Sequence, residues 1–286
     1  MADGAYADAL RLLGRVVAAT QPYADQLLVI GGMVPVLYRR APGFARARLA
    51  PPGTTEVDMT VPPRLAPADR TMIDLLHDAD LTAFEAPGYR GQPGGQAFQD
   101  AAHGTTRKAQ TFVEFLAPLR GRGDKGLLEV QAGLRAEALR YLDLLAFEPL
   151  VLQAADVPEL GVETTSRLRV PQPALYVAQK ILARRSGRHP DKLGKDLAYV
   201  FDVAVLSQPL WANQVEVVRR AAAEAVERRR WLARAGRDLR TLFAAPTADG
   251  PVHGARIFRD LMPGAAPSER EIQLLVTRFT EQVFSA

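Results

Sequence analysis

Three acidic residues are the side chains in this sequence best suited to metal-assisted chemistry. Glu56 and Asp58 lie two positions apart in residues 54–61, an alternating segment rich in β-forming residues. Side chains at i and i+2 of a strand project from one face, so both carboxylates can reach the same divalent cations. Two cations about 3.5–4 Å apart can stabilise the attacking and leaving oxygens of a phosphoryl transfer. Taken alone, such a pair is more commonly a solvated strand face.

Glu114 is the third acid, and it lies in residues 111–116, which we expect to form another strand. Its neighbours Val113 and Phe115 must face the opposite side of that strand. A lone acid in an apolar strand is costly to bury without a partner. Glu114 therefore either faces water at a sheet edge or acts as a ligand beside other polar groups.

Gly31 and Gly32 join a short apolar run at residues 26–30 to a predicted helix at residues 33–40. The pattern predicts a buried strand, a tight turn and a helix start. A helix N-terminus offers unpaired N–H groups to an anion, and glycine lets the backbone approach a phosphate closely. Turns of this kind are also common as purely structural joints.

The remaining periodicity predicts an α+β chain of two parts, residues 1–170 with a mixed sheet and flanking helices, and residues 171–286 mostly helical. Pro171 and Pro173 mark the boundary. In the first part we expect a loop or hairpin over the Gly- and Gln-rich residues 87–108 and an exposed turn at 121–126. The predicted helices span residues 5–19, 33–40, 67–79, 134–145, 174–185, 192–206, 213–235 and 268–284, the last with Ser268 as its N-cap. The predicted strands span residues 26–30, 54–61, 111–116, 150–153 and 166–170.

Composition narrows the chemistry further. The 286 residues include no cysteine, which excludes disulfides, thiolate nucleophiles and Cys-ligated zinc. The four histidines are scattered, and no nucleophile elbow or P-loop occurs. The net charge of +4 permits a nucleic-acid partner without requiring one. With no secretory signal pattern and no spanning apolar stretch, we expect a cytoplasmic protein without a membrane partner.

The order of these features resembles the nucleotidyltransferase superfamily that includes DNA polymerase beta. Its pattern is a strand, a Gly-Gly or Gly-Ser helix start, a strand with two acids one residue apart, and a third acid on an adjacent strand. The resemblance implies catalytic and metal-binding roles for Glu56, Asp58 and Glu114, and nucleotide contacts for Gly31 and Gly32.

Residues 54–59 also resemble the T-x-D-[IV]-D segment of the minimal and AbiEii-like branches, with Thr54 as the motif threonine and a nucleotide-binding role. The first acid, Glu56, departs from the usual aspartate. Glutamate is one methylene longer and could displace a metal ion, which bears directly on whether the site is active.

Residues 173–203 resemble a helical segment of the AbiEii-like proteins. The resemblance implies nucleotide-binding roles for Lys180, Arg184, Lys195 and Asp196, while Asp202 comes later than the family's further aspartate. Lys180 and Arg184 are four positions apart and share one helix face. The alternative is that these charges form an ordinary solvated stripe.

Together the resemblance implies a metal-dependent nucleotidyltransferase that uses Mg²⁺ or Mn²⁺. It would move a nucleoside monophosphate from an NTP such as ATP to a hydroxyl of RNA, tRNA, a protein or a small molecule. Two alternatives remain open. The Glu56 departure points to a weakened nucleotidyltransferase-fold protein with a binding or regulatory role, and family analogy points to the toxin of a toxin–antitoxin pair.

An arginine-rich segment follows the part of the chain that carries the resemblance. Glu216, Glu224 and Glu227 partly compensate its charge, which is typical of a salt-bridged exposed helix. The functional alternative is that these arginines contact the phosphate backbone of an RNA acceptor. The arginines are Arg219, Arg220, Arg228, Arg229, Arg230, Arg234, Arg237 and Arg240.

Overall fold

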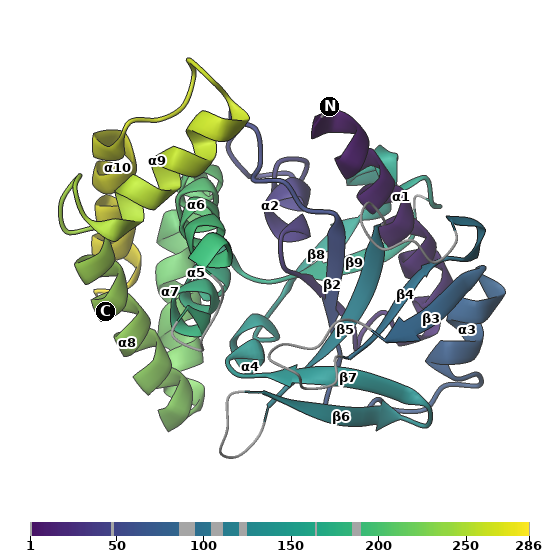
Figure 1. The fold of residues 1–286 in the computed structure, drawn as a ribbon. Helices are drawn as coiled ribbons and strands as arrows, with labels where there is room; N and C mark the ends of the chain where they lie inside the picture. Colours follow the sequence, from purple (N-terminus) through teal and green to yellow (C-terminus); the bar gives the residue numbers. More distant parts are fainter. Residues whose placement is uncertain are drawn as a thin grey trace. The chain divides into compact units, whose positions relative to one another are not determined.

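A computed structural model describes residues 2–46, 49–85, 95–103, 111–119, 125–163, 165–184 and 190–285. The chain forms two compact units (Figure 1). The sheet unit comprises Met1–Val34 and Gly53–Val170, and the helical unit comprises Pro35–Pro52 and Pro171–Ala286. A mixed sheet with flanking helices followed by a C-terminal helical region confirms the predicted α+β fold class.

The main sheet of the sheet unit is organised around β5. One edge of β5 pairs with β2 in parallel, and its other edge pairs first with antiparallel β4 and then with parallel β7. The outer pairs, β1 with β2, β3 with β4 and β6 with β7, are antiparallel. The strands are β1 (Leu28–Ile30), β2 (Glu56–Thr60), β3 (Leu81–Glu85), β4 (Gln96–Asp100), β5 (Phe112–Pro118), β6 (Lys125–Gln131) and β7 (Leu134–Leu139).

Helix α1 (Ala2–Ala19) covers one face of this sheet. Helix α1 contacts β2 and β5, and its Leu13 and Val16 are fully buried. Within the sheet, Phe98 packs edge-on against Phe115, with the ring centroids 5.8 Å apart. The unit also contains α3 (Met72–Asp78), α4 (Leu142–Leu145), the antiparallel pair β8 (Leu150–Gln153) and β9 (Arg167–Val170), and 3-10 turns at Gln21–Tyr23, Ala101–His103, Ala154–Asp156 and Pro158–Leu160.

Two predictions for the sheet unit are wrong. Residues 134–145 form β7 and then α4, instead of one helix. Leu134, Ala136 and Ala138 are buried in strand alternation, and pairing on both edges outweighs the helical preference of this Leu-, Ala- and Glu-containing segment. The second wrong prediction is the loop at residues 87–108, because strand β4 lies within it and a 3-10 turn follows β4. Residues 87–94 and 104–108 of that segment are outside the described residues. Residues 121–124 of the predicted turn are also outside them. Strands β3 and β6 were not predicted.

The helical unit is built around α5 (Pro173–Ala183), in which every residue is buried. Helix α5 contacts α6, α7 and α8. The other elements are α6 (Pro190–Leu206), a 3-10 turn at Gln208–Leu210, α7 (Trp211–Glu224), α8 (Val226–Leu242), α9 (Asp249–Leu261) and α10 (Glu269–Val283). No helix in the described ranges is long and apolar enough to span a membrane.

The single helix predicted for residues 213–235 is wrong. Ala225 is extended, with φ −147° and ψ 136°, and it separates α7 from α8. Neither Gly nor Pro marks this break in the sequence, and the surrounding residues are good helix formers. The break lets α7 and α8 pack against each other while each also contacts α5, so tertiary packing overrides local propensity here.

Helix α2 (Met33–Tyr38) carries the chain from the sheet unit into the helical unit, where residues 35–52 are held by several contacts. The buried Tyr38 hydroxyl donates a hydrogen bond to the Pro171 carbonyl at 2.5 Å, and the Tyr38 ring stacks on Phe44. The Ala45 amide donates to the Leu206 carbonyl at 2.8 Å. These long-range contacts make a segment from the first fifth of the chain part of the helical unit.

The predicted N-cap of the last helix is confirmed, and replacing it is expected to cost stability. The Ser268 hydroxyl accepts a hydrogen bond from the Glu271 amide, and the Glu271 carboxylate accepts one from the Ser268 amide at 2.7 Å. The hydrogen bonds that the Ser268 hydroxyl and the Ser268 amide donate to the Glu271 carboxylate lower the pKa of Glu271. Ser268→Ala should reduce the free energy of unfolding by about 1 kcal/mol in urea denaturation. Ser268→Asp, which can still cap, should lose much less; an equal loss for both variants would argue against the cap.

Candidate active site

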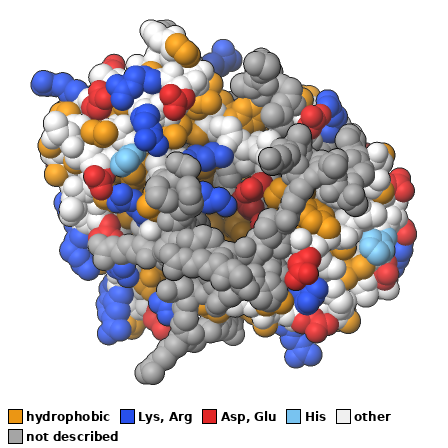
Figure 2. Space-filling view, viewed as in Figure 1, with side chains coloured by type: hydrophobic (Ala, Val, Ile, Leu, Met, Phe, Trp, Pro, Cys, Tyr) orange, Lys and Arg blue, Asp and Glu red, His pale blue; other side chains and the backbone are white. Residues whose placement is uncertain are grey.

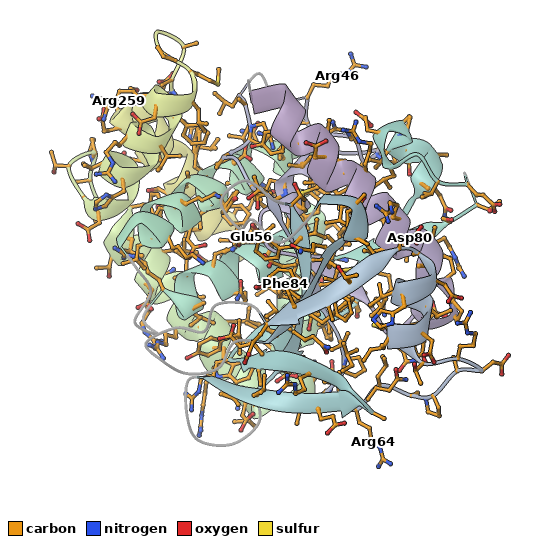
Figure 3. All side chains as sticks on the ribbon, turned by 45° about the vertical axis from the view of Figure 1, so that its right-hand side comes forward. Arg46, Glu56, Arg64, Asp80, Phe84 and Arg259 are labelled. Atoms are coloured by element: carbon orange, nitrogen blue, oxygen red, sulfur yellow. The ribbon has the colours of Figure 1, made fainter. Side chains whose placement is uncertain are left out.

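Strand pairing brings the three predicted catalytic acids to one face of the sheet. Asp58 lies beside Glu114 in the parallel register of β2 and β5, and Glu56 lies two residues before Asp58. Neighbours in register project from the same face, so all three carboxylates share it. All three side chains are partly exposed, whereas the alternating residues Val57 and Val113 are fully buried. Figure 3 marks Glu56 at the first residue of β2.

The acidic face is the one turned away from α1. Met59, which alternates with Asp58 along β2, lines a small cavity together with Val17 of α1 and Val29 of β1. Since successive strand residues point to opposite faces, Asp58 projects away from that helix. The sheet thus separates an apolar side, which forms the core, from a side that carries the carboxylates.

Gly31 makes room for the Asp58 carboxylate. β1 pairs with β2 so that Ile30 lies opposite Asp58, and the chain turns at the next residue. Gly31 has φ +67°, and a Cβ built on it would lie 1.8 Å from Asp58 Oδ2. The glycine is therefore required by backbone conformation and by the aspartate packed over it, independently of the predicted phosphate contact. Gly32 follows within the same turn and is buried.

Gly31→Ala is expected to impair the site more than the fold. The positive φ alone should cost about 1–2 kcal/mol of folding free energy. The added methyl group should also push the Asp58 carboxylate from its position and lower any activity that depends on this carboxylate by at least about tenfold. Gly161→Ala is the matched control, because Gly161 has φ +65° but nothing within 4 Å of a built Cβ. Equal activity of the two variants at matched folded fractions would contradict this account.

Thr54 fixes the backbone at the entry to β2. Its hydroxyl donates a hydrogen bond to the Glu56 carbonyl at 3.1 Å and lies 3.3 Å from the Glu56 amide, from which it accepts. A local side-chain bond of this kind holds the chain in one conformation just before the strand begins. Thr54 therefore orients Glu56, and its predicted contact with nucleotide stays a prediction.

The donor set suits a metal ion that is shared with a nucleotide. In the described part of the chain, no three Asp, Glu, His or Cys side chains converge as a ready-made metal site. Mg²⁺ is usually held by one or two carboxylates together with substrate phosphates and water, and not by a cage of protein ligands alone. Asp58 with a neighbouring glutamate provides ligands of that kind.

A fourth acid on this face was missed from the sequence. Glu137 of β7 is the register neighbour of Leu116, which lies two residues beyond Glu114 on β5. Glu137 therefore projects from the same face as Glu114. Glu137 was not predicted as a site residue because residues 134–145 were predicted as a helix. The alternation of apolar residues at Leu134, Ala136 and Ala138 was the sequence signal for a strand that could have identified it.

Within the helical unit, Lys180 and Asp196 form a buried ion pair. Lys180 Nζ lies 3.1 Å from Asp196 Oδ1, and the two residues are 7% and 4% exposed. The ammonium also lies 5.5 Å and 5.2 Å from the ring centroids of Tyr176 and Tyr199. The alternative of a solvated stripe is therefore wrong for Lys180. Burial raises the pKa of Tyr176, and the nearby Tyr199 and Asp196 add to this.

The other two predicted nucleotide-binding residues are less enclosed. Lys195 Nζ lies 5.9 Å from the Tyr199 ring centroid, next to the Lys180 pair. Arg184, at the end of α5, forms an ion pair with Asp249 at 3.2 Å. Sequence reasoning missed both tyrosines, although Tyr176 precedes Lys180 by one helical turn and could have been recognised as its neighbour.

Asp202 is also held by a partner that the sequence did not suggest. Arg39 donates from Nη1 and Nη2 to its two carboxylate oxygens, at 2.8 Å and 2.5 Å. The Asp202 side chain is fully buried. Burial raises the pKa of Asp202, and the Arg39 guanidinium opposes that rise. This pair ties residues 35–52 to α6 inside the helical unit.

Comparison with known proteins gives one family. The model of the NTP_transf_8 family, described as nucleotidyltransferase, matches residues 10–225. No curated protein matches the chain. The match extends over most of the chain and includes Gly31, Asp58, Glu114 and the Lys180–Asp196 pair. The chain therefore belongs to the nucleotidyltransferase family NTP_transf_8.

Proposed function

We propose that the chain transfers a nucleoside monophosphate from an NTP to a hydroxyl acceptor, with its chemistry on the acidic face of β2 and β5. The observation that carries the proposal is the register that sets Asp58 beside Glu114, with Gly31 packed directly beneath Asp58. Carboxylates at this spacing are the residue types that metal-assisted phosphoryl transfer needs. The family match supports the same class of reaction.

In this proposal, Asp58 and Glu56 would supply oxygen ligands for Mg²⁺ or Mn²⁺. The metal, when bound, supplies charge stabilisation at the phosphate oxygens. Glu114 acts either as a further ligand or as the base that accepts the proton of the acceptor hydroxyl. The hydroxyl oxygen bonds to the α-phosphorus, the bond from that phosphorus to the bridging oxygen breaks, and pyrophosphate leaves. Nucleotide-binding roles for Gly31, Gly32, Thr54, Lys180, Arg184, Lys195 and Asp196 remain predictions of the family resemblance.

The proposal is tested by labelling. Purified protein is incubated with each α-³²P-labelled NTP, Mg²⁺ and either total cellular RNA, tRNA or total protein, and pyrophosphate release is measured in parallel. We expect one acceptor class to become labelled in a reaction that EDTA abolishes. Absence of both NTP binding and pyrophosphate release with every acceptor would count against the proposed activity.

A second candidate is a nucleotidyltransferase-fold protein that binds nucleotide without transferring it. One observation favours it: Glu56 stands where the resemblance predicts an aspartate. Nucleotide binding with no label transfer, unchanged in an Asp58→Ala variant, would select this function.

The finer resemblance to the AbiEii-like branch predicts a toxin with a neighbouring antitoxin. This role is tested in cells and is separate from the biochemical assay. Growth arrest on expression, relieved by the product of an adjacent gene, would support it. Normal growth at high expression of a variant shown to be active in vitro would oppose it.

A further inference from the structure

Helix α8 carries a row of arginines that the proposed reaction does not use. Arg229, Arg230, Arg237 and Arg240 are all exposed. In the part of the chain that the structure describes, none of these four forms an ion pair, whereas Arg228 pairs with Glu224 and Arg234 with Asp238. Figure 2 shows Lys and Arg side chains gathered over α8. We call these four residues the α8 arginine stripe.

The helical repeat puts the stripe on one side of the helix. At 3.6 residues per turn, positions 229, 230, 237 and 240 fall within about a third of the circumference. The side of α8 that packs into the unit is formed by other residues, among them the buried Leu232, Ala235 and Leu239. The two acids of α8, Glu227 and Asp238, project to one side of the stripe. The stripe therefore places two pairs of guanidinium groups on one side of the helix, over a length of about 16 Å.

We infer that the α8 arginine stripe binds the phosphate backbone of a nucleic acid. A single nucleotide is too short to contact all four guanidinium groups, whereas successive phosphates of a strand can meet them in turn. Arginine is well suited to phosphate because its planar fork donates two parallel hydrogen bonds. Four such contacts give binding that weakens steeply with salt.

Other polyanionic partners fit the stripe less well. A protein partner would be expected to meet exposed aromatic or large apolar anchors. Among the described residues of α8, Val226 is the one exposed large apolar residue, and its exposed fraction is 54%. A membrane-bound amphipathic helix would present its apolar side to lipid, but the apolar side of α8 is buried in the helical unit. Charge without apolar anchors favours a nucleic-acid strand.

The test measures binding alone, so it is independent of whether the chain transfers nucleotides. Fluorescein-labelled single-stranded RNA, DNA of the same sequence and duplex RNA, each about 20 nucleotides long, are titrated with the full chain without NTP. Fluorescence anisotropy gives Kd between 50 and 250 mM NaCl. We expect the slope of log Kd against log salt to fall by about 3 in the variant with all four stripe arginines changed to Gln. Affinity near 100 mM salt should fall at least about 30-fold.

The control changes four exposed arginines of the sheet unit, Arg64, Arg70, Arg135 and Arg167, to Gln; of these, Arg70 forms an ion pair with Asp78. It alters the net charge equally and should change the slope by less than about 1. If circular dichroism shows that the fourfold stripe variant is unfolded, Arg230→Gln with Arg237→Gln should still remove about half of the effect. No salt-dependent binding by the wild type, an equal loss in the control, or binding only to phosphatidylserine vesicles would overturn the inference.

Discussion

Asp58→Asn is expected to lower nucleotidyl transfer by at least about a thousandfold while leaving the fold intact. Asparagine keeps the shape that packs over Gly31, so the turn after β1 should be undisturbed. The substitution removes the negative charge and one oxygen, which are the properties that a ligand of Mg²⁺ or Mn²⁺ requires. Losses of about 10²–10³ are typical when one electrostatic contact to a transition state is removed, and a metal ligand should lie at or above that range.

The measurement is pyrophosphate release at saturating NTP and Mg²⁺, alongside the thermal unfolding midpoint. Asp69→Asn is the control, since Asp69 is exposed in the loop before α3 and the change removes the same charge from the same unit. It should keep nearly full activity. If Asp58→Asn retained more than about a tenth of wild-type activity, the carboxylate at position 58 would not be the metal ligand that the proposal requires.

Arg39→Met is expected to cost about 3–5 kcal/mol of folding free energy, the largest stability effect that the structure predicts. The substitution leaves the fully buried Asp202 carboxylate without its bidentate guanidinium partner. It also removes hydrogen bonds from Arg39 to the Pro35 and Leu49 carbonyls. Urea unfolding at pH 7.5 measures the loss. Arg39→Met combined with Asp202→Leu should recover much of it, because removing both charges avoids an uncompensated buried ion. A double variant as unstable as the single one would contradict this reasoning.

The cost of Arg39→Met should also depend on pH. Burial already raises the pKa of Asp202, and losing the opposing guanidinium raises it further. A carboxyl whose pKa is higher in the folded than in the unfolded chain favours folding below that folded pKa and loses this contribution as pH rises through it. The deficit of Arg39→Met relative to wild type should therefore be smaller at pH 5 than at pH 7.5. A deficit that grows on acidification would show that Asp202 is not the group left unpaired.

The local part of the site could be predicted from the sequence because it depends on neighbours along the chain. The spacing of Glu56 and Asp58 fixes their common face once the segment is a strand, and the strand before Gly31 follows from the four apolar residues 27–30. The position of Glu114 beside Asp58 rested on the resemblance, since pairing of β2 with β5 joins residues more than fifty positions apart. Glycine is required at position 31 because the Asp58 carboxylate packs against it. No local sequence pattern indicates this contact.

Features that depend on packing between residues far apart in the sequence were not predicted. Residues 134–139 have helix-forming composition but form β7, because both of its edges find strand partners. Ala225 breaks a helix whose sequence has no breaking residue, since the two halves pack separately. The burial of Lys180 follows from α5 being enclosed on all sides, and the pairing of Arg39 with Asp202 joins residues 163 positions apart. In each case the deciding contacts are long-range.

Manganese binding measured by electron paramagnetic resonance tests the central claim most directly. Free Mn²⁺ is titrated with the wild-type chain, with and without a non-hydrolysable NTP analogue, and then with the Asp58→Asn variant. Since the described residues provide no protein-only metal cluster, we expect tight Mn²⁺ binding in the wild type only when nucleotide is present, with loss of that binding in the variant. Nucleotide-dependent Mn²⁺ binding of equal strength in Asp58→Asn would contradict the assignment of the acidic face as the catalytic site.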